Sequence, residues 1–514
     1  MFQDFNVEPI LSPGFLIKTF YFENMSSLFI AQRHYRVFQL VVFLAFIAIW
    51  YLANDGLAFW DDYTYLRFAN DVNQESFNIT NNHFTSRLGM IYPVAWLIKI
   101  VGNSTYAAAL YPLLCSLILL ALIFWLGNRQ GHWIGIVGAL MILVDYHILT
   151  FSTHLFPEMP LALFVFGALI CYDTVNKREG DYRLLALLMC LLLLAAFLIK
   201  TSIFICIPLF LFLFLNDLRQ SKNKSFWIIS SALLVFFFLL HGFWYQETFG
   251  DFWYRFNNIS DNHQATEKTY FDKPSTEIFK RLTYLPLVGF TKGGFFIPLL
   301  FGAPAFLSLK RKDWSLNNSN NIWAISAILI IASWWFISTN WRYYSPMPTD
   351  TRHITFVIPL LIMAGAYWWI EKGIFKKLLQ SQLKWVVVLA LMAIPVYKIT
   401  KAGDRSFKEL SQVVNEQFVS DEQPQKIITD GLLSYGYSFF YDFKNTQDVY
   451  DWWVELDFES VRVGDYLLVN SGVLNDRYEE PGYLQLLKNS IAIKGLNLEE
   501  LDANGKITLY RIVE

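Results

Sequence analysis

The chain has 514 residues, of which 55% are hydrophobic, 18% aromatic and only 16% charged. Soluble domains carry roughly a quarter charged residues, so this composition, with long apolar runs recurring between residues 37 and 398, is that of a polytopic membrane protein. The formal net charge of −2 gives no basic surface for a nucleic acid, which excludes that class of partner. All the cysteines fall within apolar runs, which is typical of small buried side chains rather than of disulfides or metal ligands (Cys115, Cys171, Cys190 and Cys206).

Hydropathy predicts about eleven membrane spans within a transmembrane domain that covers residues 37–401. Lys and Arg cluster at alternate ends of these spans, so the positive-inside rule places residues 1–36 in the cytoplasm. The opposite side then receives the first loop, 54–106, and the C-terminal residues 402–514. The expected spans are 37–53, 107–127, 133–151, 159–175, 184–199, 202–216, 226–245, 293–309, 321–338, 354–370 and 384–399.

Segment 89–102 (GMIYPVAWLIKIVG) is the apolar run that could change this topology. It is only about 14 residues long, which is short for a hydrocarbon core, and it contains Lys99. We therefore expect a helix that lies in the membrane interface. If the segment did cross the membrane, every later segment would change sides.

The C-terminal residues 402–514 have a different pattern from the rest of the chain. Their apolar residues come in short runs bounded by turn residues, as in KIITDG, GDYLLVNSG and ITLYRIV, and a helix-compatible stretch precedes them in RSFKELSQVVNEQF. This alternation predicts a small α/β domain outside the membrane. The sequence therefore indicates a helical membrane domain followed by a small extramembrane domain.

Ionisable side chains gather on the side opposite the basic clusters. The pair Asp61-Asp62 follows the first span, and Lys200 occupies a very short turn between the fifth and sixth spans. Each alone has a plain explanation: an interface loop, a snorkelling lysine or a topogenic charge. Carboxylates and cations that reach one face from five distant segments nevertheless favour a site. The other candidates on this face are His154, Glu158, Arg342, Tyr343, Arg352 and His353.

The order and side of these motifs resemble the GT-C glycosyltransferases, in the bacterial branch related to protein O-mannosyltransferases and to the aminoarabinose transferases that modify lipid A. The resemblance covers roughly residues 35–370. Its motifs are FWDDYTYL, SRLGMIYP, FSTHLFPEMPLALF, LAAFLIKTS and DTRHITFVIPLL. The chain departs from many relatives in having Asp62 in place of Glu and Glu158 in place of Asp. The Pro-Pro that often follows the first-loop histidine is also missing after His83, where Thr85-Ser86-Arg87 stands.

The resemblance implies a sugar donor on a polyprenyl monophosphate and an inverting transfer to an envelope acceptor at the periplasmic face of the bacterial inner membrane. Such a reaction needs a base for the acceptor's hydroxyl proton and cations for the departing phosphate. Asp61 is the expected general base, because the family places its catalytic acid at the first position of the pair. Asp62 is expected to be its partner or to orient the acceptor. Lys200 and Arg352 are expected to hold the lipid phosphate.

The remaining candidates are expected to bind substrate. They are Glu158, His353, Arg87 and Tyr343. A divalent ion is compatible with Glu158, His353 and His83, but no tight spacing of ligands requires one. The sequence does not specify the sugar, nor whether the acceptor is a lipid, a glycan or a protein.

Two other functions stay open at this point. A lipid-linked saccharide transporter or flippase also spans the membrane many times, but such proteins often contain internal repeats and discontinuous helices. The two halves of this chain show no repeat, and its unusual charges lie mostly near one interface. The second alternative is a polysaccharide polymerase or ligase that uses a diphosphate donor.

Overall fold

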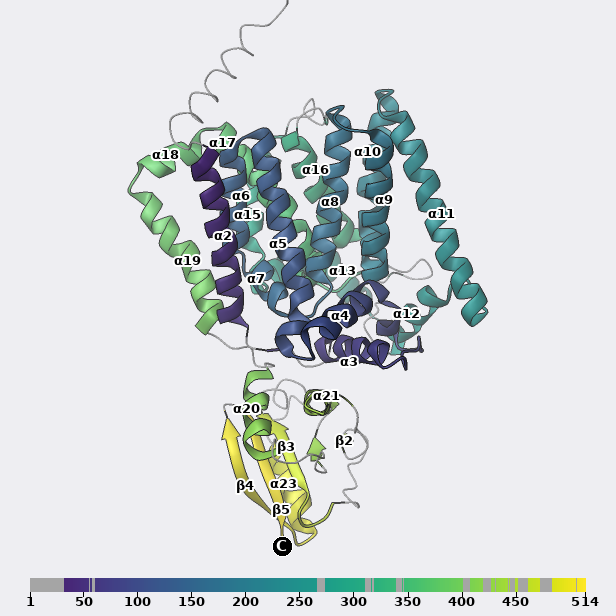
Figure 1. Cartoon of the computed structure of the whole chain (residues 1–514), viewed down its shortest axis with the longest axis vertical. Helices are drawn as coiled ribbons and strands as arrows, with labels where there is room; N and C mark the ends of the chain where they lie inside the picture. Colours follow the sequence, from purple (N-terminus) through teal and green to yellow (C-terminus); the bar gives the residue numbers. More distant parts are fainter. Residues whose placement is uncertain are drawn as a thin grey trace, which may run out of the picture.

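The computed structural model comprises a bundle of long helices with a small sheet-containing domain at one end (Figure 1). It describes residues 32–514 except 55, 58–60, 266–272, 310–315, 317–318, 339–343, 345, 401–406, 419–426, 430, 442, 444–448, 452–460, 472–482 and 505.

Eight helices in the described part of the chain are long and apolar enough to cross a membrane. They are α2 (Gln32–Ala53), α5 (Thr105–Gln130), α8 (Glu158–Asn176), α9 (Tyr182–Ile199), η2 with α10 (Thr201–Cys206 and Ile207–Arg219), α11 (Lys224–Phe249), η4 with α17 (Thr351–Val357 and Ile358–Glu371) and α19 (Leu383–Thr400). Each coincides with one of the expected spans, so the prediction of a polytopic helical membrane protein is confirmed.

The other expected spans are broken or short. The pair α6 (His132–Val144) and α7 (Tyr146–Thr153) is bent by 61°, and the pair α14 (Leu285–Lys292) and α15 (Phe296–Leu307) by 119°. Counting each bent pair as one span gives up to ten, and α16 (Ser319–Phe336) is a shorter apolar helix at the remaining expected position.

Asp145 explains the break between α6 and α7. Its backbone is extended, and its carboxylate accepts a hydrogen bond from the amide of Ile148 at 2.9 Å, which caps the first turn of α7. Helix ends leave amide groups without partners, and in an apolar bundle those groups must be satisfied by side chains. Asp145, which is only 2% exposed, therefore has a structural role in ending one helix and starting the next.

Short helices cover the end of the bundle that faces the small domain. Figure 1 draws α3 (Asp61–Asn73), α4 (Leu88–Val101) and α12 (Tyr254–Ala265) at this end. At about 1.5 Å per residue, the 14 residues of α4 reach only about 21 Å, which is less than a hydrocarbon core of about 30 Å. Gly89 lets α4 approach the end of α9, since a Cβ there would lie 2.8 Å from the side chain of Ile199.

The small domain contains a five-stranded sheet in the order β2-β1-β3-β5-β4. Strand β1 (Ile427–Thr429) is parallel to β2 (Val449–Asp451) and to β3 (Tyr466–Asn470), whereas β5 (Ile507–Val513) is antiparallel to β3 and to β4 (Asn497–Asn504). The helices α20 (Phe407–Phe418), α21 (Gly431–Phe439) and α23 (Tyr483–Ile493) complete the domain. The expected small C-terminal α/β domain is thus confirmed as a fold.

The two ends of the bundle differ as the expected topology requires. The basic helix α18 (Ile374–Gln380) lies at the end opposite to the C-terminal domain, next to the start of α2 (Figure 1). The helices α3 and α4 lie at the same end as the domain. The assignment of this end to the periplasm remains a prediction.

An alkaline phosphatase fused after Glu514 should be active in a bacterial host, because the enzyme folds only outside the cytoplasm. Its activity per fused protein is the measurement, and a fusion after Lys377 in α18 is the matched control, which should be inactive. An inactive fusion after Glu514 at normal expression would contradict the topology.

Candidate functional site

Asp61 and Asp62 begin helix α3 at the end of the bundle that faces the C-terminal domain. Acidic side chains in a first helical turn are favourable because the helix N-terminus carries partial positive charge. The two carboxylates differ in burial, since the side chain of Asp61 is 18% exposed whereas that of Asp62 is fully buried. Only Asp61 is therefore open to a substrate.

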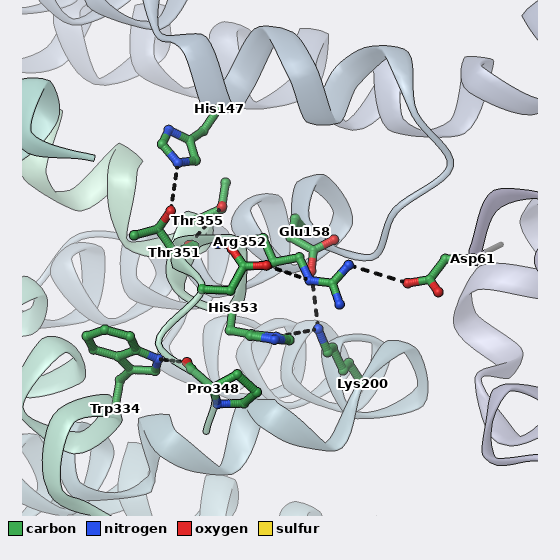
Figure 2. Close-up of polar contacts among 11 residues, drawn as sticks. Asp61, His147, Glu158, Lys200, Trp334, Pro348, Thr351, Arg352, His353 and Thr355 are labelled. Carbon is green, nitrogen blue, oxygen red and sulfur yellow. Dashed lines mark hydrogen bonds and ion pairs between the residues drawn. The ribbon is translucent and has the colours of Figure 1, made fainter. Parts of the chain in front are cut away.

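Arg352 is the cation that faces Asp61. Its guanidinium Nη1 lies 3.6 Å from Asp61 Oδ2, as Figure 2 shows. Asp350 accepts a hydrogen bond from the backbone amide of Arg352 at 3.0 Å, and its other carboxylate oxygen lies 3.3 Å from Arg352 Nε. The guanidinium also lies over the ring of Phe156, 5.8 Å from its centroid. These contacts fix the arginine beside α3.

Lys200 is the second cation and reaches the site from the turn between α9 and η2. Its Nζ lies 3.2 Å from Glu158 Oε1 and 3.2 Å from His353 Nδ1 (Figure 2). Burial lowers the pKa of Lys200, and the positive charges of Arg87 and Arg352 act in the same direction. The carboxylate of Glu158 opposes this shift and favours the ammonium form.

His154 lies beside Asp62. Its Nδ1 lies 3.5 Å from Asp62 Oδ2, and the side chains of both residues are largely buried. His154 lies between α7 and α8, four residues before Glu158. The short segment from His154 to the start of α8 therefore supplies contacts both to Lys200 and to the second carboxylate of α3.

Arg87 donates a hydrogen bond to the hydroxyl of Tyr65 on α3. Its guanidinium lies over the ring of Phe84 at 4.4 Å from the centroid. Burial raises the pKa of Tyr65, so this phenol stays protonated. Arg255 of α12 is a further buried cation whose Nη2 donates to the carbonyl of Phe197 at 2.8 Å, and burial lowers its pKa to about 10.

Comparisons with known proteins bear on the fold that carries this arrangement. Residues 89–245 match the sequence profile of a family described as dolichyl-phosphate-mannose-protein mannosyltransferase. The structure of ArnT from Cupriavidus metallidurans bound to undecaprenyl phosphate is similar with a TM-score of 0.60 at 12% identity, covering 93% of this chain and 98% of that chain. The apo structure of ArnT gives a TM-score of 0.53 at 12% identity, covering 92% and 97%. No curated protein sequence matches the chain.

The chain has a GT-C fold. The expected resemblance to GT-C membrane glycosyltransferases is thus confirmed, and it extends beyond the matched profile. That profile contains Glu158 and Lys200 but ends before Arg352, and it begins after Asp61. The fold comparison covers 93% of the chain, far more than the matched profile does.

The GT-C fold brings most of the expected site residues together. Lys200 contacts Glu158 and His353, and Arg352 contacts Asp61. Because Arg352 and His353 are neighbours in the chain, these two sets of contacts form one cluster of polar and charged residues. Metal binding gains no support from their geometry, because no group of three or more His, Cys, Asp or Glu side chains in the described residues is arranged to hold an ion.

Two of the other expected residues have different outcomes. His83 packs its ring on Phe84, with the centroids 4.2 Å apart, within η1 (His83–Ser86). Tyr343 lies outside the described residues.

Two neighbours of the cluster, Asp350 and Tyr65, were not among the expected site residues, although both lie within the quoted motifs. His154 was a candidate on this face, but its contact with Asp62 was not predicted. The position of Asp350 could have been inferred from the sequence, because Asp is a favoured N-cap residue at the start of a helix. The partners of Tyr65 and His154 depend on chain segments that only folding brings together.

The buried pair of Lys200 and Glu158 should be sensitive to the loss of one partner. Glu158→Gln leaves the ammonium without its nearest counter-charge and should lower the free energy of unfolding by about 3 kcal/mol. Thermal or denaturant unfolding in detergent measures the effect. The double variant Glu158→Gln/Lys200→Met removes both charges and should recover part of the loss. A single variant as stable as the wild type would show that the pair is not coupled.

Proposed function

We propose that the protein transfers a sugar from a polyprenyl-monophosphate donor to an envelope acceptor at the periplasmic face of the bacterial inner membrane. The observation that carries the proposal is that Lys200 and Arg352, two cations from distant segments, converge beside the partly exposed carboxylate of Asp61 at one end of a GT-C bundle. The similar structure of ArnT, bound to undecaprenyl phosphate, supports a lipid-phosphate donor.

The two cations suit the phosphate of the donor. Lys200 is a compact charge and Arg352 a planar fork, and charge-assisted hydrogen bonds from both kinds of group to phosphate are strong. Negative charge grows on this phosphate as the bond to the sugar breaks, so positive groups fixed in advance stabilise the transition state. Burial of Lys200 strengthens this interaction because water competes less for the anion.

Asp61 suits the role of general base. It would accept the proton of the acceptor's hydroxyl while that oxygen bonds to the anomeric carbon and the carbon–oxygen bond to the phosphate breaks. The polyprenyl phosphate then leaves with the bonding electrons. A donor phosphate on Arg352 would compete for the guanidinium that otherwise faces Asp61 at 3.6 Å. Donor binding would thereby free the carboxylate for the acceptor.

Transfer accounts for the site better than transport does. Asp61, Glu158, Lys200 and Arg352 lie at or next to the ends of α3, α8, α9 and η4. A translocation path instead needs polar groups near the middle of the bundle. Transporters also contain broken helices like the bent pair α6 and α7. Here the break is explained by the carboxylate of Asp145, which caps α7. A monophosphate is favoured over a diphosphate because Lys200 and Arg352, whose positive charges lie close enough to interact, match one compact anion.

Asp61→Asn keeps the size of the side chain and removes its proton affinity, so turnover should fall by about 10²-fold to 10⁴-fold. Transfer of a radiolabelled sugar from purified polyprenyl-phosphate sugar to membrane acceptors measures it, with donor binding followed separately. Asp71→Asn, an acid-to-amide change near the other end of α3, is the matched control and should retain activity. A fully active Asp61→Asn enzyme would move the role of base to Asp62 or Glu158.

Lys200→Ala and Arg352→Ala should each weaken donor use by at least about tenfold, or about 1.4 kcal/mol of transition-state stabilisation. The measurement is kcat/KM for the donor. Lys99→Ala, which removes an exposed lysine of α4 at the same end of the bundle, is the control and should leave the value unchanged. Wild-type kinetics in both variants would place the phosphate elsewhere.

Lys200→Arg adds a pH test to the same assay. Because the pKa of Lys200 is lowered, its ammonium should lose its proton below the ordinary value of 10.5, and donor use should fall as the pH rises toward that value. A guanidinium stays protonated there, so Lys200→Arg should move this alkaline limb to higher pH while it restores only part of the activity. If the alkaline limb of the pH profile did not move in Lys200→Arg, the titrating group would be a residue other than Lys200.

A further inference from the structure

The first residues of α3 contact three separate parts of the protein. Asp61 faces Arg352 of η4, Asp62 faces His154 of the loop before α8, and Tyr63 faces Phe439 of α21. Successive residues of a helix project about 100° apart, so neighbouring positions meet different surroundings. Two of these partners belong to the membrane domain, and the third belongs to the C-terminal domain.

The contact between Tyr63 and Phe439 is buried and aromatic. Tyr63 has no exposed surface and Phe439 is 9% exposed, and their ring centroids lie 6.0 Å apart at an interplanar angle of 63°. This edge-to-face arrangement is the geometry that aromatic pairs favour. Figure 1 places α21 directly below α3, so the contact joins the two domains beside the acidic pair.

Phe439 is itself held firmly within the C-terminal domain. It is the last residue of α21, and the ring centroid of Phe443 lies 6.1 Å from that of Phe439. The turn between them is held by a hydrogen bond from the Phe443 amide to the Ser438 carbonyl. Leu433 and Tyr437 of α21 are also buried, and the ring of Tyr437 packs against the ring of Phe418 on α20. A side chain fixed in this way can transmit the position of the domain to α3.

We propose that the C-terminal domain is a working part of the active site, with Phe439 as a positioning residue that fixes the first turn of α3 and so sets Asp61 relative to Arg352. The inference rests on the proposed transfer reaction. Asp61 is only two residues from Tyr63, and a shift of about 1 Å in a reacting group can cost about a hundredfold in rate. Phe439 acts on Asp61 through Tyr63.

This role has a kinetic signature. Lys200 and Arg352, the expected phosphate ligands, are carried by the turn after α9 and by η4 rather than by α3. Loss of the Phe439 ring should therefore displace the base and leave the phosphate site intact. Turnover should fall while the KM for the donor stays nearly constant.

Phe439→Ala in the full-length protein tests the proposal. We expect kcat to fall by about tenfold to a hundredfold, with the donor KM within about twofold of the wild type. Phe439→Leu keeps an apolar side chain against Tyr63 and should recover most of the turnover. If Phe439→Ala fails to fold, Phe439→Val replaces it in the series, and kcat should fall from Phe to Leu to Val.

Ile491→Ala is the matched control. Ile491 is 1% exposed and packs in the separate apolar cluster of the domain that includes Leu467 and Ile512. Its truncation weakens the domain without touching α3, so kcat should stay near the wild-type value. An equal loss in this variant, wild-type turnover in Phe439→Ala, or a loss explained wholly by a higher donor KM would each overturn the proposal.

Hydrogen exchange separates this inference from the reaction itself. The amides of residues 61–65 should exchange faster in Phe439→Ala than in the wild type or in Ile491→Ala, whatever the substrate is. If the wild type transferred no sugar from a polyprenyl-phosphate donor while this difference held, the proposed function would fail and the positioning contact would stand. If the amides of residues 61–65 exchanged no faster in Phe439→Ala, the contact between Phe439 and Tyr63 would not position α3, even if the enzyme transferred the sugar.

Discussion

The site depends on one constraint, which is that charged groups buried at the end of an apolar bundle must compensate one another. Lys200 lies among helix ends where a lone ammonium would be costly, and Glu158 and His353 both contact it at 3.2 Å. Arg352 is compensated in the same way by Asp61 and Asp350. The arrangement of α8, η2 and η4 follows from bringing these partners together.

In the proposed reaction, the same compensation would prepare the site for the donor phosphate. A phosphate that enters the cluster replaces carboxylates as the partner of the two cations, so binding exchanges one set of charge-assisted contacts for another. The net gain is small for a bound substrate and larger as charge builds on the phosphate. Under the proposed function, such a site would favour the transition state over the ground state, which is what catalysis requires.

Breaks in the helices place these charges where they are needed. Lys200 has an extended backbone and ends α9 before η2 begins, and Asp350 caps η4 directly before Arg352. Each break leaves backbone groups that continuous helices would satisfy internally, and each is accompanied by a capping or charged side chain. The polar residues therefore both interrupt the helices and form the cluster, and the C-terminal domain closes the same end of the bundle against α3.

The sequence by itself determined the class of protein, the positions of the spans, the α/β character of the C-terminal residues and the residues of the charged cluster. It could do so because long apolar runs, basic flanks and isolated ionisable residues are local signals that need no knowledge of contacts. The tertiary structure alone decided which of them touch: that Arg352 faces Asp61, that His154 faces Asp62, and that Phe439 reaches Tyr63. It also decided that α6 and α7 bend at Asp145. These pairings join segments up to hundreds of residues apart, and they arise from packing, which no local pattern encodes.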